Sequence, residues 1–430
     1  MATPSPGAAL LAIATPLVLV HTSHLPGFTV GGADVAVYLS DLVLLALAAA
    51  VVTSLARHGL PRLGRGRHLW LLAAGLLAWI GIETVLPLVS GREYAFSTHA
   101  VTAAKFAEYA VLAVAVPVLA RKRAERELLL AVLVGWACLA ALVGLAQFLG
   151  WNVLDAWAAG RRQPSFLGHH DFAVLAGCSY AIGLACVVFR RPAAFALAAC
   201  AAGAIGLVVS GSIAGLLGIL LALAAAVAAA RALRSTTRAL AAAAAGVAVV
   251  GLLVVAFRGN DLNDFLRFAG VLDERQEQHG VETYSHRTLL AYLGVRIWQD
   301  HPVLGAGWQA SREYSLLSGY LPDAHERFPD VPEEAFPRPG FTFGVQNAWI
   351  QSLADLGLIG FALFAALLTL GAWAGLSAAL RGRSLVALAG AGMVLVTAAV
   401  WTAQGLTPGL GLDSLTWLGL GLVAAEAGRG

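Results

Sequence analysis

The chain has 430 residues, of which 59% are hydrophobic and 12% are charged, and its formal net charge is +3. Soluble domains carry about 25% charged residues, so this composition excludes an ordinary soluble protein. The small net charge also excludes a typical nucleic-acid binder, and we expect no nucleic-acid partner.

Apolar runs occupy most of the chain, and runs of about 17–25 residues are long enough to cross a bilayer as helices. The predicted fold class is therefore all-α: a polytopic membrane protein with about twelve transmembrane helices and one large extracytoplasmic loop that contains short helices. We expect an N-terminal bundle of about nine spans at residues 1–257, the large loop at 258–345, and about three C-terminal spans at 346–430. The individual spans are expected at 8–21, 35–56, 69–89, 101–120, 128–149, 172–189, 193–209, 213–230, 239–257, 346–378, 384–404 and 411–427.

Basic residues are concentrated in every second connection between these spans, at positions 57–67, 121–126, 190–191, 231–238, 381–383 and 429. Short loops rich in Lys and Arg stay in the cytoplasm. The alternation therefore predicts a multi-pass protein of the cell inner (plasma) membrane with both termini in the cytoplasm. It places the segment 258–345 on the extracytoplasmic face, because long loops are translocated regardless of their charge.

The first polar cluster lies just outside the membrane, between the spans expected at 128–149 and 172–189. It contains two arginines, two histidines and an aspartate: Arg161, Arg162, His169, His170 and Asp171. Guanidinium groups bind phosphate oxygens in bidentate fashion, so the cluster suits an anionic ligand. One alternative is an interfacial loop whose arginines contact lipid headgroups. A His-His-Asp metal site is a weaker alternative because adjacent histidines on a helix point apart, and we expect no metal and no cofactor.

The second cluster lies in the large loop. Residues 283–300 have the apolar periodicity of an amphipathic helix, with Arg287 near its start and Arg296 in its second half. An ordinary surface helix with solvated arginines is the alternative interpretation. The proline-rich stretch 321–341, which holds His325, predicts an irregular loop.

A turn follows the predicted helix. His301 and Pro302 end the helix, and Gly305 and Gly307 make a tight bend before Trp308. The bend lacks the glycine-lysine pattern of a phosphate-binding loop, so it gives little support to a nucleotide site.

The third cluster opens the span expected at 346–378, where Gln346, Asn347, Gln351 and Asp355 occur at helical spacing. Polar groups are costly in a membrane unless they have partners, so they usually face a bundle interior or a cavity. The alternative is hydrogen bonding between neighbouring helices.

These three clusters, in this order, resemble the O-antigen ligase and O-antigen polymerase superfamily of membrane glycosyltransferases. The resemblance covers about residues 150–365, together with the plan of many spans and one large late outer loop. It rests on three features: the stretch from Arg162 to Asp171; the segment from Arg287 to Asp300 followed by Pro302, Gly305, Gly307 and Trp308; and the opening Gln346-Asn347 of a span that continues to Gly357-Leu358-Ile359-Gly360.

The resemblance implies a glycosyltransferase of cell-surface polysaccharide biosynthesis. Its donor would be a polyprenyl-diphosphate-linked oligosaccharide, such as one carried on undecaprenyl diphosphate, and its acceptor a glycan, a lipid or a protein. Among membrane lipids, at the extracytoplasmic face, Arg162 and Arg287 would neutralise the diphosphate leaving group in a metal-independent, inverting reaction. We further expect Gln346, Asn347 and His325 as catalytic residues, and Arg161, His169, His170, Asp171, Arg296, Trp308 and Asp355 as substrate-binding residues.

The chain departs from the family pattern at two positions. Family members usually have a histidine before the motif asparagine, as the proposed base for the acceptor hydroxyl, and here Gln346 stands there. An amide cannot take up a proton at neutral pH. A Ser-Arg pair that often opens the span after the short outer turn is also absent, because this chain has Ser212-Ile213. A substitute base could come from His325, Glu333, Glu334 or His170.

Two other functions compete with glycosyl transfer. A transporter or flippase of lipid-linked sugars would explain the polar groups in the membrane but not the large loop with its arginines. A non-catalytic family member in polysaccharide assembly would explain Gln346. The transferase hypothesis predicts that Arg162 and Arg287 face one cavity, and that Gln346 and Asn347 line this cavity too.

Overall fold

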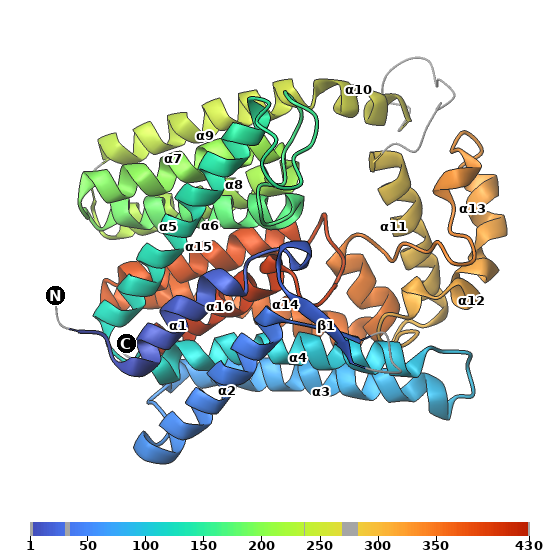
Figure 1. Ribbon diagram of the computed structural model, residues 1–430, viewed down its shortest axis with the longest axis horizontal. Coiled ribbons are helices and arrows are strands. Elements are labelled where there is room, and N and C mark those ends of the chain that lie inside the picture. The colour runs from blue at the N-terminus through green and yellow to red at the C-terminus, as the bar shows by residue number, and fades with distance from the viewer. Residues whose placement is uncertain (1–2, 31–34, 236, 269–282, 429–430) are drawn as a thin grey trace.

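The structure is a computed structural model that describes residues 3–30, 35–235, 237–268 and 283–428. It is predominantly α-helical, as expected of a polytopic membrane protein (Figure 1). Within the described residues, nine helices are long and apolar enough to cross a bilayer: α2 (Leu39–His58), α3 (Arg67–Val89), α4 (Phe96–Leu119), α5 (Arg123–Phe148), α6 (His169–Val188), α7 (Ala193–Ser210), α8 (Ile213–Ala232), α9 (Thr237–Phe257) and α14 (Ala348–Gly382).

Three shorter helices coincide with the remaining predicted spans: α1 (Pro6–Leu17), α15 (Leu385–Val400) and α16 (Gly411–Ala427). At a rise of about 1.5 Å per residue, each is shorter than the hydrocarbon core of about 30 Å. The total of about twelve spans therefore stays a prediction. Both ends of the described chain lie at the same end of the bundle, as an even number of crossings requires (Figure 1).

Helix α6 lies in the middle of the bundle and is buried along nearly its whole length. It packs against α7, α8 and α15, and α15 in turn packs against α16. A Cβ atom at Gly203 of α7 would lie only 2.6 Å from the backbone oxygen of Ala176, so this glycine lets α6 and α7 approach closely. Small residues allow such close contacts between membrane helices. The packing fixes the position of α6, and with it the two histidines at its start.

The all-α fold includes one small β-hairpin that the sequence analysis did not predict. Its strands β1 (Gly27–Val30) and β2 (Val35–Tyr38) pair antiparallel. The span predicted at 35–56 therefore begins as a strand, and α2 starts only at Leu39. The Val-Ala-Val-Tyr sequence favours a strand because β-branched and aromatic residues suit a pleated surface. The Asp41 carboxylate accepts a hydrogen bond of 2.8 Å from the Tyr38 backbone amide and so fixes the helix start.

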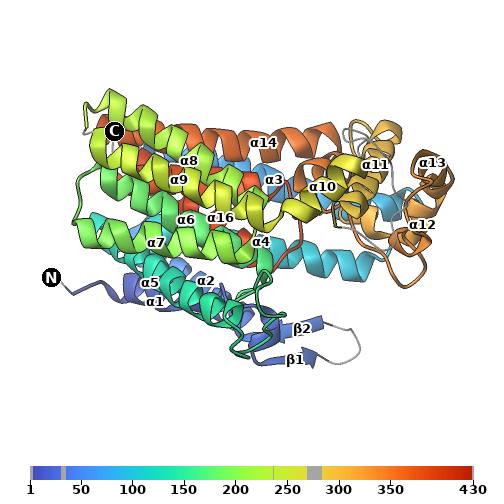
Figure 2. The ribbon, with the colours of Figure 1, turned by 90° about the horizontal axis from the view of Figure 1, so that it is seen from above.

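The polar segment after α9 forms a cap of short helices at one end of the bundle (Figures 1 and 2). The cap contains α10 (Gly259–Phe268), α11 (Thr283–Asp300), α12 (Tyr314–Leu317) and α13 (Leu321–Arg327). The bounds of α11 confirm the helix predicted at 283–300. Leu289, Leu293 and Ile297 of α11 are buried in a small core of their own. Short 3-10 helices occur at Thr22–His24, Gly64–Gly66, Ala310–Arg312, Ser318–Tyr320 and Glu333–Ala335.

The stretch predicted as an irregular loop at 321–341 is more ordered than expected. It begins with α13, and its apolar residues Val331, Ala335 and Phe336 are buried in the same small core as α11. The prolines interrupt regular structure, but the apolar residues between them hold the stretch against the rest of the cap.

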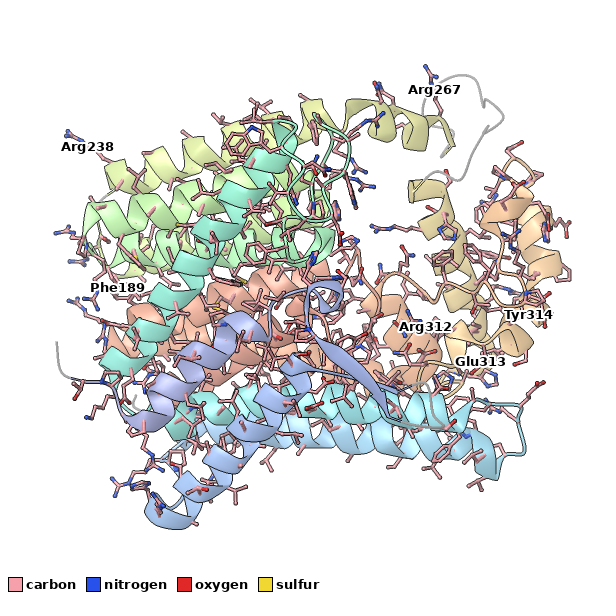
Figure 3. The ribbon with its side chains drawn as sticks, in the orientation of Figure 1. Phe189, Arg238, Arg267, Arg312, Glu313 and Tyr314 are labelled. Carbon is pink, nitrogen blue, oxygen red and sulfur yellow. The ribbon has the colours of Figure 1, made fainter. Side chains whose placement is uncertain are left out.

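Arginine side chains project from both ends of the bundle (Figure 3). Arg238 of α9 points outward at the end where the termini lie, and Arg267 of α10 points outward at the opposite end. The apolar helices between these two ends form the part of the molecule that suits a bilayer core.

Candidate active site

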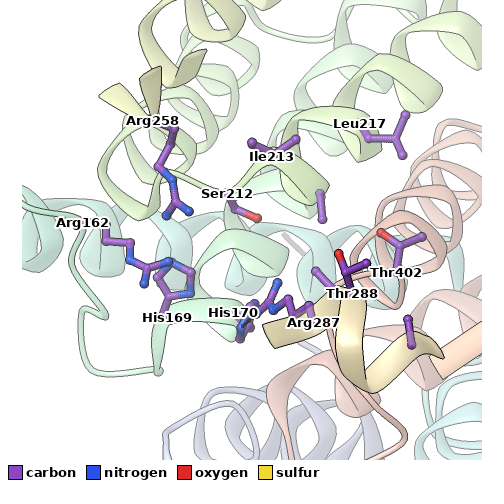
Figure 4. A pocket seen from close by; sticks show the side chains of 14 residues that line it. Arg162, His169, His170, Ser212, Ile213, Leu217, Arg258, Arg287, Thr288 and Thr402 are labelled. Atoms are coloured by element: carbon purple, nitrogen blue, oxygen red, sulfur yellow. Dashed lines mark hydrogen bonds between the residues drawn. The ribbon is translucent and has the colours of Figure 1, made fainter. Parts of the chain in front are cut away.

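A cavity of about 370 Å³ lies where the helical bundle meets the cap. Its wall is built by the loop before α6, the start of α6, the turn between α7 and α8, the end of α9, and α11 (Figure 4). Three arginines and two histidines line it, together with small and apolar residues: Arg162, His169, His170, Gly211, Ser212, Ile213, Ala214, Leu217, Arg258, Arg287, Thr288, Ala291, Thr402 and Ala403. We call this cavity the arginine cavity.

Each histidine at the start of α6 faces an arginine. The Arg162 guanidinium lies 3.5 Å from His169 Nε2, and both groups stack near Trp157, whose ring lies parallel to the His169 imidazole. The Arg287 guanidinium lies 3.1 Å from His170 Nε2. A guanidinium can only donate, so the facing nitrogen of each imidazole accepts and is unprotonated.

Arg287 joins the arginine cavity to the third motif. While its Nη2 faces His170, its Nε donates a hydrogen bond of 3.1 Å to Gln346 Oε1. The two predicted diphosphate ligands, Arg162 and Arg287, thus line one cavity. Gln346 lies beside it through this hydrogen bond.

Arg258 is a cavity residue that the sequence analysis did not single out. It follows α9 directly and is 5% exposed. Gly211, with φ of +59°, makes the turn before α8, and a Cβ atom there would lie 3.2 Å from the Phe257 ring. The glycine therefore lets the end of α9 bring Arg258 against this turn. In this way Arg258 supplies a guanidinium close to the position where the family's Ser-Arg pair is missing.

A second cavity of about 270 Å³ adjoins the first. We call it the amide cavity because glutamine side chains and backbone line much of it. His170 lines both cavities, and the other lining residues are Arg312, Phe343, Gly344, Val345, Gln346, Gln351, Gln404, Gly405 and Thr407. Among the described residues that line either cavity there is no carboxylate.

Arg312 gives the amide cavity its cation, and the sequence analysis missed this residue as well. Burial lowers the pKa of the Arg312 guanidinium from its ordinary value, and the charge of Asp355 opposes that shift. Arginine remains protonated at neutral pH even when buried. A Cβ atom at Gly344 would lie 2.5 Å from Arg312 Cγ, so this glycine makes room for the arginine stem.

The Pro-x-x-Gly-x-Gly element, residues 302–307, forms a joint between the cap and helix α14. Helix α14 is interrupted at Gly357, which has φ of +64°. At this break the Ala306 amide donates to the Ala354 carbonyl at 2.9 Å, and the Leu358 amide donates to the Pro302 carbonyl at 2.9 Å. A Cβ atom at Gly305 would collide with the carbonyl of Asp355, and one at Gly357 with the carbonyl of Val303. The second and third motifs therefore form one structural unit that fastens the cap to α14.

Several predicted site residues hold the backbone instead of lining a cavity. Asp355 is fully buried, and its carboxylate accepts hydrogen bonds from the Ser311 amide and the Gln351 side chain, both at 2.8 Å. Trp308 is also fully buried and donates from Nε1 to Thr102 at 2.9 Å.

Two more predicted site residues act as helix caps. Asn347 caps α14 by accepting from the amides of Trp349 and Ile350. Asp171 accepts a hydrogen bond of 2.8 Å from the Leu412 amide at the start of α16. The expectation that Asn347 lines the same cavity as Gln346 is wrong, because Asn347 is absent from the walls of both cavities.

Three further predicted residues lie outside both cavities. Arg161 is exposed. Arg296 pairs with Asp323 at 2.7 Å on the surface of the cap. His325 stacks on Phe336 and lies 3.6 Å from Glu333, and its side chain is 40% exposed. The structure therefore does not bring His325 to the predicted site.

Comparison with known families finds one match, to a segment of the chain. Residues 198–365 match the family described as O-antigen ligase, a range that includes Arg258, Arg287 and Gln346. This match supports a relationship of the chain to the O-antigen ligase and polymerase superfamily. A search of the curated proteins found no match. The match supports a membrane protein that processes glycans in the manner of O-antigen ligases and polymerases.

Proposed function

We propose that this protein is a membrane glycosyltransferase that transfers or polymerises a glycan from a polyprenyl-diphosphate-linked donor at the extracytoplasmic face. The observation that carries the proposal is the convergence of Arg162, Arg258 and Arg287 on one cavity. Three guanidinium groups that line one cavity suit a diphosphate, whose oxygens they bind by charge-assisted hydrogen bonds. Such groups also stabilise the charge that develops on a departing diphosphate.

The apolar side of the arginine cavity suits a lipid-linked donor. Ile213 and Leu217 of α8 line this cavity, and both are among the exposed large hydrophobic residues. Leu220 and Leu221 continue the exposed apolar surface along α8. A diphosphate held by the arginines can therefore extend its polyprenyl chain along α8, toward the bilayer.

The amide cavity suits the acceptor. Gln346 and Gln404 offer amide groups, and Phe343 offers a ring face, which are groups that recognise sugar hydroxyls and sugar faces. In the reaction, an acceptor oxygen forms a bond to the anomeric carbon while the bond from that carbon to the diphosphate oxygen breaks. The electron pair leaves with the diphosphate, and the acceptor hydroxyl loses its proton to a base.

His170 is the base that the geometry supports best, in place of His325. Among the described lining residues, only His169 and His170 have an imidazole nitrogen that can act as a proton acceptor, and only His170 lines both cavities. Its Nε2 becomes available once Arg287 turns toward the diphosphate. Cleavage through an oxocarbenium-like transition state needs the base only late, so Gln346 serves to orient the acceptor.

A reconstituted transfer assay tests this function. Protein in liposomes is given a polyprenyl-diphosphate oligosaccharide and an acceptor glycan, and both the extended product and the released polyprenyl diphosphate are measured. We expect the two products in equal amounts. Movement of the donor between leaflets without transfer would establish the transporter alternative instead. Donor binding with neither movement nor transfer would establish a non-catalytic family member.

A further inference from the structure

A separate cavity of about 470 Å³ lies at the other end of the bundle, where both termini lie (Figure 1). It is enclosed by the start of α1, the end of α2, the end of α4 and the start of α5. Its lining residues are Ser5, Pro6, Gly7, Leu10, Ala50, Thr53, Ser54, Arg57, His58, Val118, Leu119, Arg121, Lys122 and Glu125. All of these precede the segment matched by the family, so the family match assigns the cavity no role. We call it the basic cavity.

Positive charge dominates the polar side of the basic cavity. Arg57, Arg121 and Lys122 are its cations, and Glu125 is the one carboxylate among its described lining residues. The oxygens of Glu125 accept hydrogen bonds from backbone amides, that of Ser5 at 3.1 Å and that of Lys122 at 2.8 Å. These bonds use the carboxylate to fix the ends of α1 and α5, so it only partly offsets the three cations.

Arg121 is held in the wall by backbone carbonyls. Its Nη2 donates to the Gly59 carbonyl at 3.0 Å, and its Nε donates to the Val118 carbonyl at 3.1 Å. It also lines an adjoining cavity of about 340 Å³ that contains Arg62 and Arg126. Arg126 is paired with Glu426 at 2.7 Å, so Arg62 is the added cation of this neighbour.

The remaining wall of the basic cavity is apolar. Leu10, Ala50, Val118 and Leu119 contribute aliphatic side chains. The helices that enclose it present large exposed apolar residues nearby, including Ile13 of α1 and Leu45 and Val52 of α2, each more than half exposed. In a chain of this composition such surfaces face lipid. A ligand of this cavity therefore needs both an anionic and an aliphatic part.

We propose that the basic cavity binds an anionic glycerophospholipid, with its phosphate among Arg57, Arg121 and Lys122 and an acyl chain along α1 and α2. Basic pockets between transmembrane helices hold anionic headgroups in this way. A soluble phosphate would use the cations but leave the aliphatic wall uncovered. The site lies at the end of the bundle opposite the arginine cavity and does not depend on the proposed transferase activity.

Lipid binding to the delipidated protein tests the proposal. Phosphatidylglycerol and phosphatidylcholine are titrated in separate experiments, and bound lipid is counted by native mass spectrometry. The test variant is Arg57→Gln with Lys122→Gln, because both side chains are exposed and fold loss is not expected. The matched control is Arg231→Gln with Arg238→Gln, which removes the same charge from exposed positions outside the described cavities.

We expect wild type and the control to bind the first phosphatidylglycerol more tightly than phosphatidylcholine. The test variant should lose roughly tenfold or more in affinity for phosphatidylglycerol, since each basic residue near a headgroup contributes about 1 kcal/mol. Equal losses in the test variant and the control would overturn the site, because they would indicate a general charge effect. Competition by glycerol phosphate as effective as that by the whole lipid would overturn the acyl-chain part of the proposal.

Discussion

Arg287 is the side chain at which the two proposed substrate cavities meet. Its guanidinium reaches His170 with one nitrogen and Gln346 with another, so a single cation touches the proposed base and the proposed acceptor ligand. Lysine has one nitrogen on a flexible stem and cannot make both contacts in a fixed plane. We therefore expect Arg287 to be the most sensitive position for activity.

We expect Arg287→Ala to lower kcat by roughly 100-fold or more, the usual cost of removing a donor to developing negative charge. Arg287→Lys should fall between the alanine variant and wild type, because it keeps the charge and loses the fork. Arg296→Lys is the matched control, since that arginine pairs with Asp323 on the surface. The measurement is the initial rate of glycan transfer. Equal rates for Arg287→Ala and wild type would contradict the assigned role.

His170 and Gln346 are expected to respond differently to substitution. His170→Ala should nearly abolish transfer, because it removes the proposed base from the boundary between the cavities. Gln346→Ala should lower activity modestly, and Gln346→His should be tolerated or activating, because a histidine there supplies a second base at the same place. The three variants are compared by polymer length in one assay. The opposite order, with Gln346→Ala inactive and His170→Ala active, would contradict the roles proposed for these two residues.

The sequence predicted Arg162, Arg287, Gln346 and the histidines as neighbours because they stand in motifs with recognisable spacing. It did not separate ligands from caps. Three of the predicted residues are polar and lie near the outer ends of helices, as ligands would. Their side-chain oxygens, however, accept hydrogen bonds from nearby protein donors: Asn347, Asp171 and Asp355. Arg258 was missed because a lone arginine after an apolar span is an ordinary boundary residue. Only its closeness to the α7–α8 turn shows that it belongs to the cavity.

At the scale of elements, helix positions followed from hydrophobic length and periodicity, and α11 was predicted to the residue. The β-hairpin was missed because its Val-Ala-Val-Tyr strand is as apolar as the start of a span. The joint between the cap and the break of α14 was also unforeseen. Its glycines are required by contacts between segments about fifty residues apart, and such contacts leave no local pattern.

This joint can be tested at Gly305. Gly305→Ala places a Cβ atom against the Asp355 carbonyl and strains a backbone with φ of +95°, so we expect the cap to undock from α14. The strain alone costs about 1–2 kcal/mol, which predicts a lower Tm together with loss of transfer. Gly319→Ala is the control, because a Cβ atom there meets open space. A normal Tm and normal activity in Gly305→Ala would show that the joint is not needed.

At the scale of the whole molecule, the alternation of basic loops predicts an orientation that the structure alone leaves open. The cap with residue 330 should lie outside the membrane, and the segment 57–67 should lie in the cytoplasm. Asp330→Cys and Arg65→Cys, each in a chain whose native cysteines are replaced, are labelled with an impermeant thiol reagent in intact spheroplasts. We expect labelling of Asp330→Cys alone. If Asp330→Cys is labelled only after permeabilisation, the predicted orientation is wrong and the cap does not lie at the extracytoplasmic face.

The central claim is that the arginine cavity holds the diphosphate of a lipid-linked donor. The most direct measurement is the Kd for a polyprenyl diphosphate, compared between wild type and Arg162→Gln, Arg258→Gln and Arg287→Gln. Arg161→Gln is the matched control, because this exposed arginine adjoins Arg162 in the chain but lies outside the cavity. Each cavity variant should raise the Kd by roughly tenfold or more, the value of one charge-assisted hydrogen bond, while the control stays at the wild-type Kd. Unchanged affinity in the three cavity variants, or an equal loss in the control, would contradict the account.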